Sequence, residues 1–362
     1  MTWKRPVRGL VRFGLRQPRL RSLVESELKP ARTVIEPDPA LVGRTFVDRL
    51  GVEHPLDPTL HERLKPGWRT MLDPVAASRP PTDGALRDRA RKARRDVAEA
   101  SAVVAAATGA PLGGRILEIG CYDGAAAYQL ADRGGSVVAS DMARYYVVQQ
   151  PGEASDGGIA LQQAALASLR ERAGQAAGAL PAAVEFIEDD ITASALDAGS
   201  FDAIVSFEVL EHLAKPEAAF AAMYRLLRPG GVAYHEYNPF FSLIGGHSLC
   251  TLDFAWGHAR LDRADVERYL REFRPDAVVQ TLRFFDQSLN RMTLAGLRSM
   301  IWASGLEPLA VVPWSDRSLV ARLTPDVLAE VRRTHPTASA EDLLATFVAV
   351  VVRRPNVSVV MT

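Results

Sequence analysis

Two glycines and two acidic residues carry the first chemical signal in this chain of 362 residues. The segment Glu118-Ile-Gly-Cys-Tyr-Asp-Gly124 ends an apolar run in a glycine turn, and Asp141 ends the next apolar run. Because Gly120 and Gly124 have no Cβ, the backbone of this turn can approach a ligand closely. A carboxylate in the position of Asp141 can accept hydrogen bonds from both hydroxyls of a ribose. The pattern therefore indicates a site for a cofactor that contains a nucleoside.

The spacing of the glycines separates two kinds of cofactor. A dinucleotide site needs Gly-x-Gly-x-x-Gly, whose glycines and helix N-terminus receive a pyrophosphate. Tyr122 and Ala125 stand where that pattern requires its second and third glycines. Two of the glycines that would hold a phosphate are therefore missing, and NAD becomes a weaker interpretation than a cofactor without a phosphate.

Alternating strand and helix patterns must position these side chains. Such alternation predicts an α/β fold with a parallel sheet covered by helices, in which ligands bind outside the carboxyl ends of the strands. A helix end with a glycine turn, Leu226–Gly231, separates the last two runs. The strand-like runs are Arg115–Ile119, Ser136–Asp141, Val184–Asp190, Phe201–Leu213, which continues into a helix, and Val232–Tyr237.

The order of these motifs resembles that of the class I S-adenosylmethionine (SAM) methyltransferases. The resemblance is to the subgroup with Glu-x-Leu-Glu-His after strand four, here Glu208–His212, and Leu-x-Pro-Gly-Gly before strand five, here Leu227–Gly231. It implies a Rossmann-like fold, with a mostly parallel seven-stranded sheet and an antiparallel C-terminal strand. In architecture it extends from residue 115 to about residue 355, and its specific motifs occupy the first half of that stretch.

The resemblance also implies SAM as the cofactor and assigns residues to it. Gly120 would admit the backbone, Asp141 would hold the ribose, and Asp190 would accept a hydrogen bond from the adenine amino group, with Asp189 as the alternative. Tyr122 replaces the middle glycine of the family pattern, so its phenol must point away from the cofactor or form part of its wall. The remaining residues implied to bind SAM are Glu118, Gly124, Met142, Ile191 and Phe207.

The part of the chain before these motifs divides into an extension, residues 1–82, and the start of the methyltransferase domain, residues 83–362. Residues 1 to about 33 are basic, and we interpret them as a frayed N-terminal tail. The alternative is an arm that binds the surface of an anionic lipid or a polyanionic glycan. Thr82 or Asp83 can begin a helix that Gly109 ends, and in the family such a helix covers the SAM pocket. We expect the arginines of this helix on a solvated face: Arg87, Arg89, Arg91, Arg94 and Arg95.

An insertion of about residues 238–292 follows strand five and is rich in aromatic, histidine and arginine residues. Its position predicts a substrate lid above the reactive methyl group. Aromatic faces beside polar donors suit a ring with hydroxyls, and Phe254 and Trp256 either serve this purpose or form a small core. Thr293 can cap the next helix, which ends at Gly305, and the resemblance implies a final hairpin from Glu307–Trp314 and Thr346–Arg353.

Methyl transfer needs alignment of the partners, exclusion of water and, for a hydroxyl acceptor, a base. The candidates are His247 and His258 in the lid and His212 in the strand-four motif, because histidine titrates near neutrality. Further candidates are His235, Glu236 and Asp253. The sequence thus predicts a SAM-dependent O-methyltransferase whose substrate is a sugar or glycan intermediate first, and a small phenolic metabolite second.

Composition excludes several other classes of protein. The chain carries 43 basic and 43 acidic residues, so no overall field recruits nucleic acid. The two cysteines form no disulfide framework, no Cys/His spacing suits zinc, and no apolar run is long enough to span a bilayer. We therefore expect a cytoplasmic enzyme with neither a metal nor a nucleic-acid partner.

Three alternatives stay open at this point. A dehydrogenase would require the missing dinucleotide motif, and an RNA methyltransferase would require a basic groove beside the cofactor. A non-catalytic SAM-binding protein would keep the glycine turn without a base, and Tyr122 is the residue that keeps this alternative open.

Overall fold

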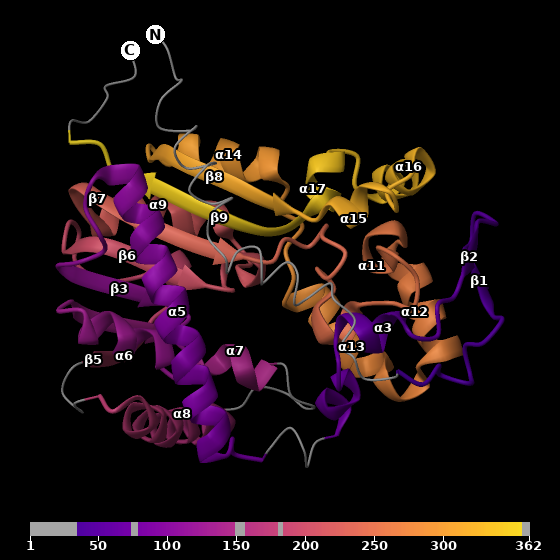
Figure 1. Ribbon diagram of the computed structural model, residues 1–362, viewed down its shortest axis with the longest axis horizontal. Helices are drawn as coiled ribbons and strands as arrows, with labels where there is room; N and C mark the ends of the chain where they lie inside the picture. Colours follow the sequence, from indigo (N-terminus) through magenta and orange to yellow (C-terminus); the bar gives the residue numbers. More distant parts are fainter. Residues whose placement is uncertain (1–34, 74–78, 149–155, 180–183, 357–362) are drawn as a thin grey trace, which may run out of the picture.

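A seven-stranded sheet lies at the centre of the computed structural model, which describes residues 35–73, 79–148, 156–179 and 184–356 (Figure 1). The strand order is β5-β4-β3-β6-β7-β9-β8. The first five strands in this order pair in parallel, and β9 is antiparallel to both of its neighbours. The predicted Rossmann-like class I methyltransferase sheet is therefore confirmed. The bounds are β3 Arg115–Ile119, β4 Ser136–Asp141, β5 Val184–Glu188, β6 Phe201–Phe207, β7 Leu227–Tyr237, β8 Glu307–Ser315 and β9 Ala345–Arg353.

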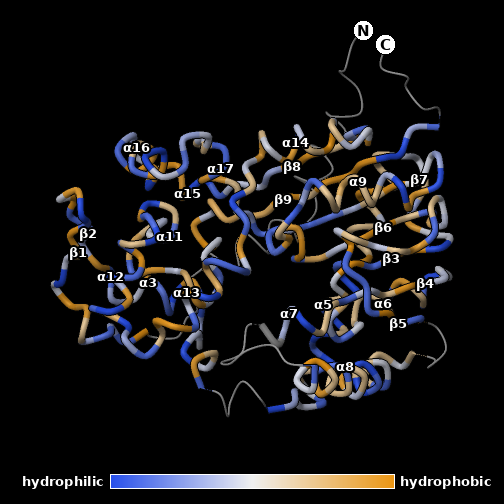
Figure 2. The backbone as a smooth tube through the Cα atoms, turned by 180° about the vertical axis from the view of Figure 1, so that it is seen from behind, coloured by the Kyte–Doolittle hydropathy of each residue, from blue (hydrophilic) through white to orange (hydrophobic). Residues whose placement is uncertain are grey.

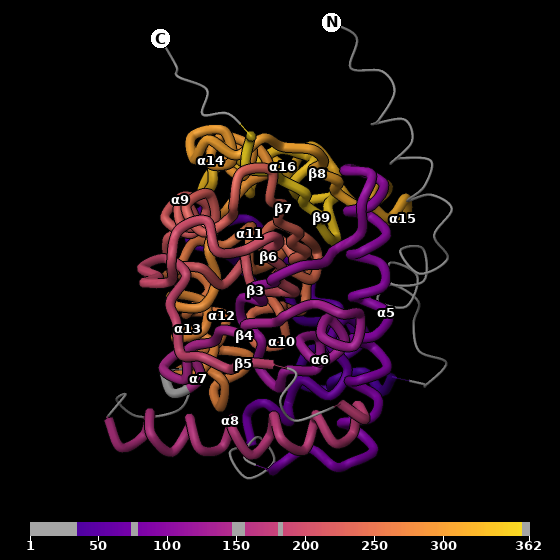
Figure 3. Tube along the Cα trace, turned by 90° about the vertical axis from the view of Figure 1, so that its left-hand side faces the viewer, coloured from indigo at the N-terminus to yellow at the C-terminus, as the bar shows by residue number. Residues whose placement is uncertain are grey.

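Helices cover both faces of this sheet because successive side chains of a strand point to opposite sides. Ile116 packs into a core with α5 (Asp83–Thr108), α6 (Ala125–Asp132) and α8 (Asp156–Ala177). The next residue, Leu117, packs into a second core on the other face, with α9 (Pro216–Leu226) and α14 (Leu294–Ala303). Figure 3 shows α8 running below β5 and α7, with α5 along one side.

The helix predicted before strand one is confirmed as α5. The hydroxyl of Thr82 accepts a hydrogen bond from the backbone N–H of Ala85, and Gly109 ends the helix at φ +85°. The solvated face expected for the arginines of this helix does not include Arg89. Arg89 is half-buried and its guanidinium lies 3.1 Å from Oδ2 of Asp123, because this turn of α5 faces the end of the sheet.

The insertion that was predicted to be a lid is part of a separate hydrophobic core, which we call the accessory core. Three stretches of chain build it: residues 41–64, residues 240–289 and residues 319–343. Phe254 and Trp256 lie inside it. Figure 2 shows that these three stretches lie together beside one end of the sheet. The same figure shows hydrophobic residues along β9.

The elements around the accessory core are short. They are β1 Thr45–Val47, β2 Glu53–Pro55, α3 Leu60–Leu64, η1 Trp68–Leu72, α10 His247–Cys250, α11 Gly257–Arg260, α12 Arg263–Phe273, η5 Pro275–Ala277, α13 Val278–Gln287, α15 Arg317–Val320, α16 Pro325–Thr334 and α17 Ala340–Leu344. Residues 41–64 therefore pack mainly against the insertion, through contacts such as Phe46 against Tyr269. The predicted division at residue 82 stays a prediction.

Two further expectations concern the ends of the chain. Thr293 caps α14 as predicted, through a hydrogen bond from the N–H of Gly296, and β8 and β9 form the expected antiparallel pair. The basic arm, residues 1 to about 33, lies outside the described residues. Among the described helices, none is both long and apolar enough to cross a membrane.

Candidate active site

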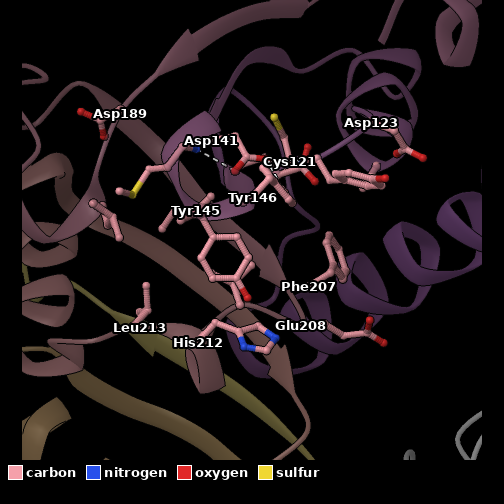
Figure 4. A pocket seen from close by; sticks show the side chains of 18 of the residues that line it. Cys121, Asp123, Asp141, Tyr145, Tyr146, Asp189, Phe207, Glu208, His212 and Leu213 are labelled. Atoms are coloured by element: carbon pink, nitrogen blue, oxygen red, sulfur yellow. Dashed lines mark hydrogen bonds between the residues drawn. The ribbon is translucent and has the colours of Figure 1, made fainter. Parts of the chain in front are cut away.

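A cavity of about 670 Å³ opens where β3, β4, β5 and β6 reach their carboxyl ends (Figure 4). This is the position that parallel α/β sheets favour for ligands, and the volume lies within the range of small-molecule sites. Eight of the nine residues that the sequence assigns to the cofactor line it: Glu118, Gly120, Tyr122, Asp141, Met142, Asp190, Ile191 and Phe207. Gly124 does not line the cavity, because it lies behind the turn at the start of α6.

The two glycines of the turn have positive φ angles and leave no room for a side chain. Gly120 has φ +69°, and a Cβ there would lie 2.5 Å from Cγ2 of Val209. Gly124 has φ +74°, and a Cβ there would lie 2.6 Å from the ring of Phe186. Both positions combine a left-handed backbone with a close neighbour, so a larger residue would force the turn to move.

Asp141 is held in one orientation at the end of β4. Its Oδ2 accepts hydrogen bonds from the N–H of Tyr122 at 2.5 Å and from the hydroxyl of Tyr146 at 3.0 Å. Its Oδ1 accepts from the N–H of Met142 at 2.7 Å, and Arg170 lies 3.8 Å away. The carboxylate therefore ties together the turn after β3, the start of α7 (Ala143–Val148) and α8.

The other acids of the cavity differ in their surroundings. Burial raises the pKa of Glu118 well above its usual value, and the nearby Asp123 and Asp141 add to this effect. Asp190 is engaged locally, since its Oδ1 accepts from the N–H and the hydroxyl of Thr192. Asp189 has a buried Oδ2 with no partner among the described residues, and burial raises its pKa. Both aspartates line the cavity, so both remain candidates for the adenine contact.

Aromatic side chains form the other half of the cavity wall. Tyr145 and Tyr146 come from α7, and Phe207 ends β6. Figure 4 shows the ring of Tyr145 extending toward His212, and the two ring centroids are 5.8 Å apart. Sequence reasoning missed both tyrosines, although an aromatic pair directly after the ribose-type Asp141 was a usable signal.

Residues of α5 also line the cavity and were not assigned to it from the sequence. Arg89, Lys92 and Asp96 face the opening. Lys92 lies 3.0 Å from Oδ2 of Asp96 and 3.9 Å from Oε1 of Glu208. The cationic groups at this side of the cavity therefore have acidic partners.

His212 is the predicted base candidate that the structure places in the cavity wall. It belongs to the short helix η4 (Leu210–His212), and its Nδ1 lies 2.5 Å from the carbonyl oxygen of Ser288. Since a carbonyl can only accept, Nδ1 carries the proton and Nε2 is left without one. The amide of Asn290 donates to the carbonyls of Leu210 and Leu213 and so fixes this turn. Burial lowers the pKa of His212.

His247 lies behind His212 and is not part of the cavity wall. The centroids of the two rings are 4.9 Å apart, and burial lowers the pKa of His247 well below its usual value. Its backbone has φ +52°, which is uncommon for a residue other than glycine. Together with the carboxylate of Glu211, the two imidazoles form a group of metal-ligand type.

His258 is not brought to the cavity, in contrast to the sequence expectation. It is 1% exposed, its Nε2 donates to the carbonyl of Phe240 at 2.8 Å, and burial lowers its pKa to about 4. The apolar segment around it folds into the accessory core, so His258 is not placed to act as a base on a substrate in the cavity.

The three secondary candidates for the base also lie outside the cavity lining. Nδ1 of His235 lies 2.8 Å from the hydroxyl of Ser206, and Glu236 accepts from the hydroxyl of Tyr234. Asp253 forms a buried ion pair with Arg274. Each of these side chains has a structural partner.

Comparison with known proteins identifies the family. The sequence model of the methyltransferase domain family matches residues 85–311, so the chain belongs to this family. It is similar to the ubiquinone biosynthesis O-methyltransferase of Alkalilimnicola ehrlichii, with 34% identity over 158 residues, or 41% of this chain and 54% of that protein. The protein of the same name from Xanthomonas axonopodis pv. citri is 31% identical over 121 residues, or 33% and 41% of the two chains.

The chain therefore spans about half the length of the curated relatives it matches. Among solved structures, it is similar to an S-adenosylmethionine dependent methyltransferase from Mesorhizobium loti, with a TM-score of 0.38 and 18% identity, covering 67% of this chain and 92% of that one.

The chain carries a methyltransferase domain on a seven-stranded sheet of the class I type, and SAM is the cofactor that its sequence motifs imply. The residues of the cavity fit this cofactor. The glycine turn lets the backbone approach the cofactor, and Asp141 is positioned to accept hydrogen bonds from hydroxyl groups. The Oδ2 atom of Asp189, which has no hydrogen-bond partner among the described residues, offers a buried acceptor.

Proposed function

We propose that this chain transfers a methyl group from SAM to a hydroxyl oxygen of a small ring-shaped molecule. The observation that carries the proposal is the composition of the cavity. One part holds the acids and the glycine turn expected for SAM, and the other holds the rings of Tyr145 and Phe207 beside His212. A flat or cyclic acceptor can lie against such rings while its hydroxyl meets the imidazole.

The kind of ring is a further part of the proposal. A sugar or glycan intermediate and a phenolic metabolite both offer hydroxyls, but the rings of Tyr145 and Phe207 in the cavity wall favour stacking with an aromatic acceptor. The relatives named ubiquinone biosynthesis O-methyltransferase support an oxygen acceptor on such a ring. We therefore place a phenolic acceptor first and a sugar second.

When bound, SAM supplies a methyl carbon already activated by its sulfonium. The chain has to align the acceptor oxygen, exclude water and help the hydroxyl lose its proton. His212 is the proposed activating group, because its Nδ1 is engaged with Ser288 and its other nitrogen remains available at the cavity wall. Asn290 and Ser288 hold the imidazole in place and are proposed as positioning residues.

The test uses the full chain, SAM and a matched panel of phenols, sugars and primary amines, with formation of the demethylated cofactor as the readout. We expect turnover with hydroxylated rings and none with the amines. His212→Ala should lower turnover by about 10²–10⁴-fold with SAM affinity unchanged. His258→Gln is the control: it removes an imidazole remote from the cavity but keeps an N–H donor for the Phe240 carbonyl, so turnover should be retained.

Three results would contradict the proposal. Turnover confined to amines would exclude an oxygen acceptor, and equal turnover in wild type and His212→Ala would exclude the role of His212. SAM binding without turnover on any hydroxylated ring in the panel would favour the non-catalytic SAM-binding protein.

A further inference from the structure

A cluster of three ligand-type side chains lies directly behind the cavity wall. Glu211 and His212 are neighbours on η4, whereas His247 begins α10 in the insertion. One carboxylate oxygen and one imidazole nitrogen from each histidine all lie within 4.8 Å of one another. The fold thus joins the strand-four motif and the insertion at one point.

Two atoms of this cluster are buried without a hydrogen-bond partner among the described residues: Oε2 of Glu211 and Nε2 of His247. Glu211 is 1% exposed, and its other oxygen accepts from the N–H of Asn238 at 3.1 Å. Buried polar atoms are nearly always paired in folded proteins. Two unpaired atoms on residues of one ligand-type cluster therefore indicate a ligand that both can bind.

The histidines are held by contacts outside the cluster. His212 donates from Nδ1 to the carbonyl of Ser288, which leaves Nε2 unprotonated. A second-shell bond of this kind orients the histidine ligands of metal sites. His247 is held in its left-handed backbone by the hydroxyl of Thr251, which donates to the His247 carbonyl, and by its own N–H, which donates to the carbonyl of Ile244.

We propose that Glu211, His212 and His247 bind one divalent transition-metal ion of the zinc type. Two imidazoles and one carboxylate are a donor set found at catalytic zinc sites, whereas Mg²⁺ and Ca²⁺ prefer oxygen ligands. Zinc–ligand distances of about 2.0–2.2 Å place the donor atoms of a tetrahedral site roughly 3.5 Å apart, and the three donor atoms here lie within 4.8 Å of one another.

With the ion bound, the free nitrogen of His212 is a metal ligand and no longer acts as the base, so the ion takes over the activation of the acceptor hydroxyl. The ion would leave one coordination position open, and we assign that position to this hydroxyl. His212 lines the cavity, so the free position of an ion bound to it can face the substrate. The O–H bond breaks and its proton passes to solvent water. The oxygen then forms an O–C bond with the methyl carbon as the C–S bond breaks, leaving a thioether. This role rests on the proposed function, whereas binding of the ion does not.

The test measures metal binding without SAM or substrate. Chelator-treated full chain is titrated separately with Zn²⁺, Co²⁺ and Mg²⁺ by calorimetry, and the Co²⁺ absorption spectrum reports the coordination. We expect one equivalent of Zn²⁺ and of Co²⁺ to bind, with Mg²⁺ much weaker. Glu211→Gln and His247→Gln, which keep side-chain volume, should each weaken Zn²⁺ binding at least tenfold. His335→Gln changes another histidine and should leave it unchanged.

The proposal is overturned if wild type binds no stoichiometric Zn²⁺, or if both cluster variants bind Zn²⁺ as tightly as His335→Gln does. If a metal-free variant has a lower melting temperature than metal-free wild type, its metal binding is measured from the Co²⁺ absorption spectrum at a temperature where the variant is still folded. Failure of methyl transfer with Zn²⁺ binding intact would count against the proposed function alone.

Discussion

Asp141 joins the fold to the chemistry at the scale of a single residue. Its two oxygens already accept hydrogen bonds from Tyr122, Met142 and Tyr146. These bonds fix the carboxylate before any ligand binds, so the side chain loses little rotational freedom when the ligand binds. A fixed, charged acceptor at this point is what a ribose diol requires.

Replacing Asp141 by Asn should lower SAM affinity at least tenfold. The substitution keeps the shape but removes the charge, and a hydrogen bond to a charged group contributes roughly 1.5–3 kcal/mol. Calorimetry with SAM measures the effect. Asp132→Asn, at an exposed position on α6, is the control. Equal SAM affinity in wild type and Asp141→Asn would show that Asp141 does not hold the cofactor.

His258 should make stability depend on pH. Burial, together with the charges of His335 and Arg291, lowers its pKa to about 4 in the folded chain. As pH falls from about 6.5 toward 4, the unfolded chain takes up a proton that the folded chain does not, so stability falls. This loss amounts to about 3 kcal/mol at most and does not grow below pH 4.

Urea unfolding at pH 7 and pH 4.5 checks this pH dependence. His258→Gln keeps an N–H donor for the Phe240 carbonyl but cannot titrate, so it should lose less stability than wild type over this interval. An identical loss in both proteins would mean that His258 contributes nothing to the pH dependence.

At the same scale, the sequence was informative where motifs are local. The acids and glycines at the strand ends were found, because each directly follows an apolar run. Tyr145, Arg89 and Ser288 were missed, since their place in the cavity depends on how α7, α5 and the insertion pack. The grouping of His247 with Glu211 could not be predicted either, because only the fold brings the insertion to η4.

At the scale of elements, the turn between β3 and α6 depends on backbone conformation. Gly120→Ala should destabilise the chain by at least about 2 kcal/mol, because a left-handed alanine and a crowded Val209 both cost free energy. Denaturant unfolding measures this, and Gly113→Ala is the control, since a Cβ at Gly113 meets no atom within 4 Å. Equal stability of the two variants would show that the turn tolerates a side chain.

The long elements were predictable and the short ones were not. The strands of the sheet and α5 have strong apolar patterns with clear end signals, such as Thr82 and Gly109. The helices α10 and α11 have four residues each, which is too short for a helical period to show. Their stability comes from the accessory core, which no local pattern reveals.

At the scale of the whole molecule, the accessory core ties the N-terminal part to the insertion. The N–H of Asp57 donates to the carbonyl of Asp253. Nε2 of His61 lies 2.8 Å from the carbonyl oxygen of Ser248, and Trp68 lies against Arg274. The insertion in turn supplies the carbonyl that orients His212. Residues remote from the cavity therefore support its wall.

Two truncations test this dependence. Deleting residues 1–34 should leave the melting temperature and SAM affinity nearly unchanged, because that stretch has few clustered apolar residues. Deleting residues 1–73 should lower the melting temperature by more than about 5 °C, because it removes one side of the accessory core. Equal melting temperatures for the two truncated chains would contradict the shared core.

Transfer of a methyl group to a ring hydroxyl is tested most directly by following the methyl group itself. The full chain is incubated with SAM that carries an isotope-labelled methyl group and with the phenols and sugars of the panel, and the product is examined by NMR. We expect a labelled methyl carbon bonded to a ring oxygen, formed with an equal amount of demethylated cofactor. A label found only on nitrogen or carbon, or only in unreacted SAM that the chain has bound, would contradict it.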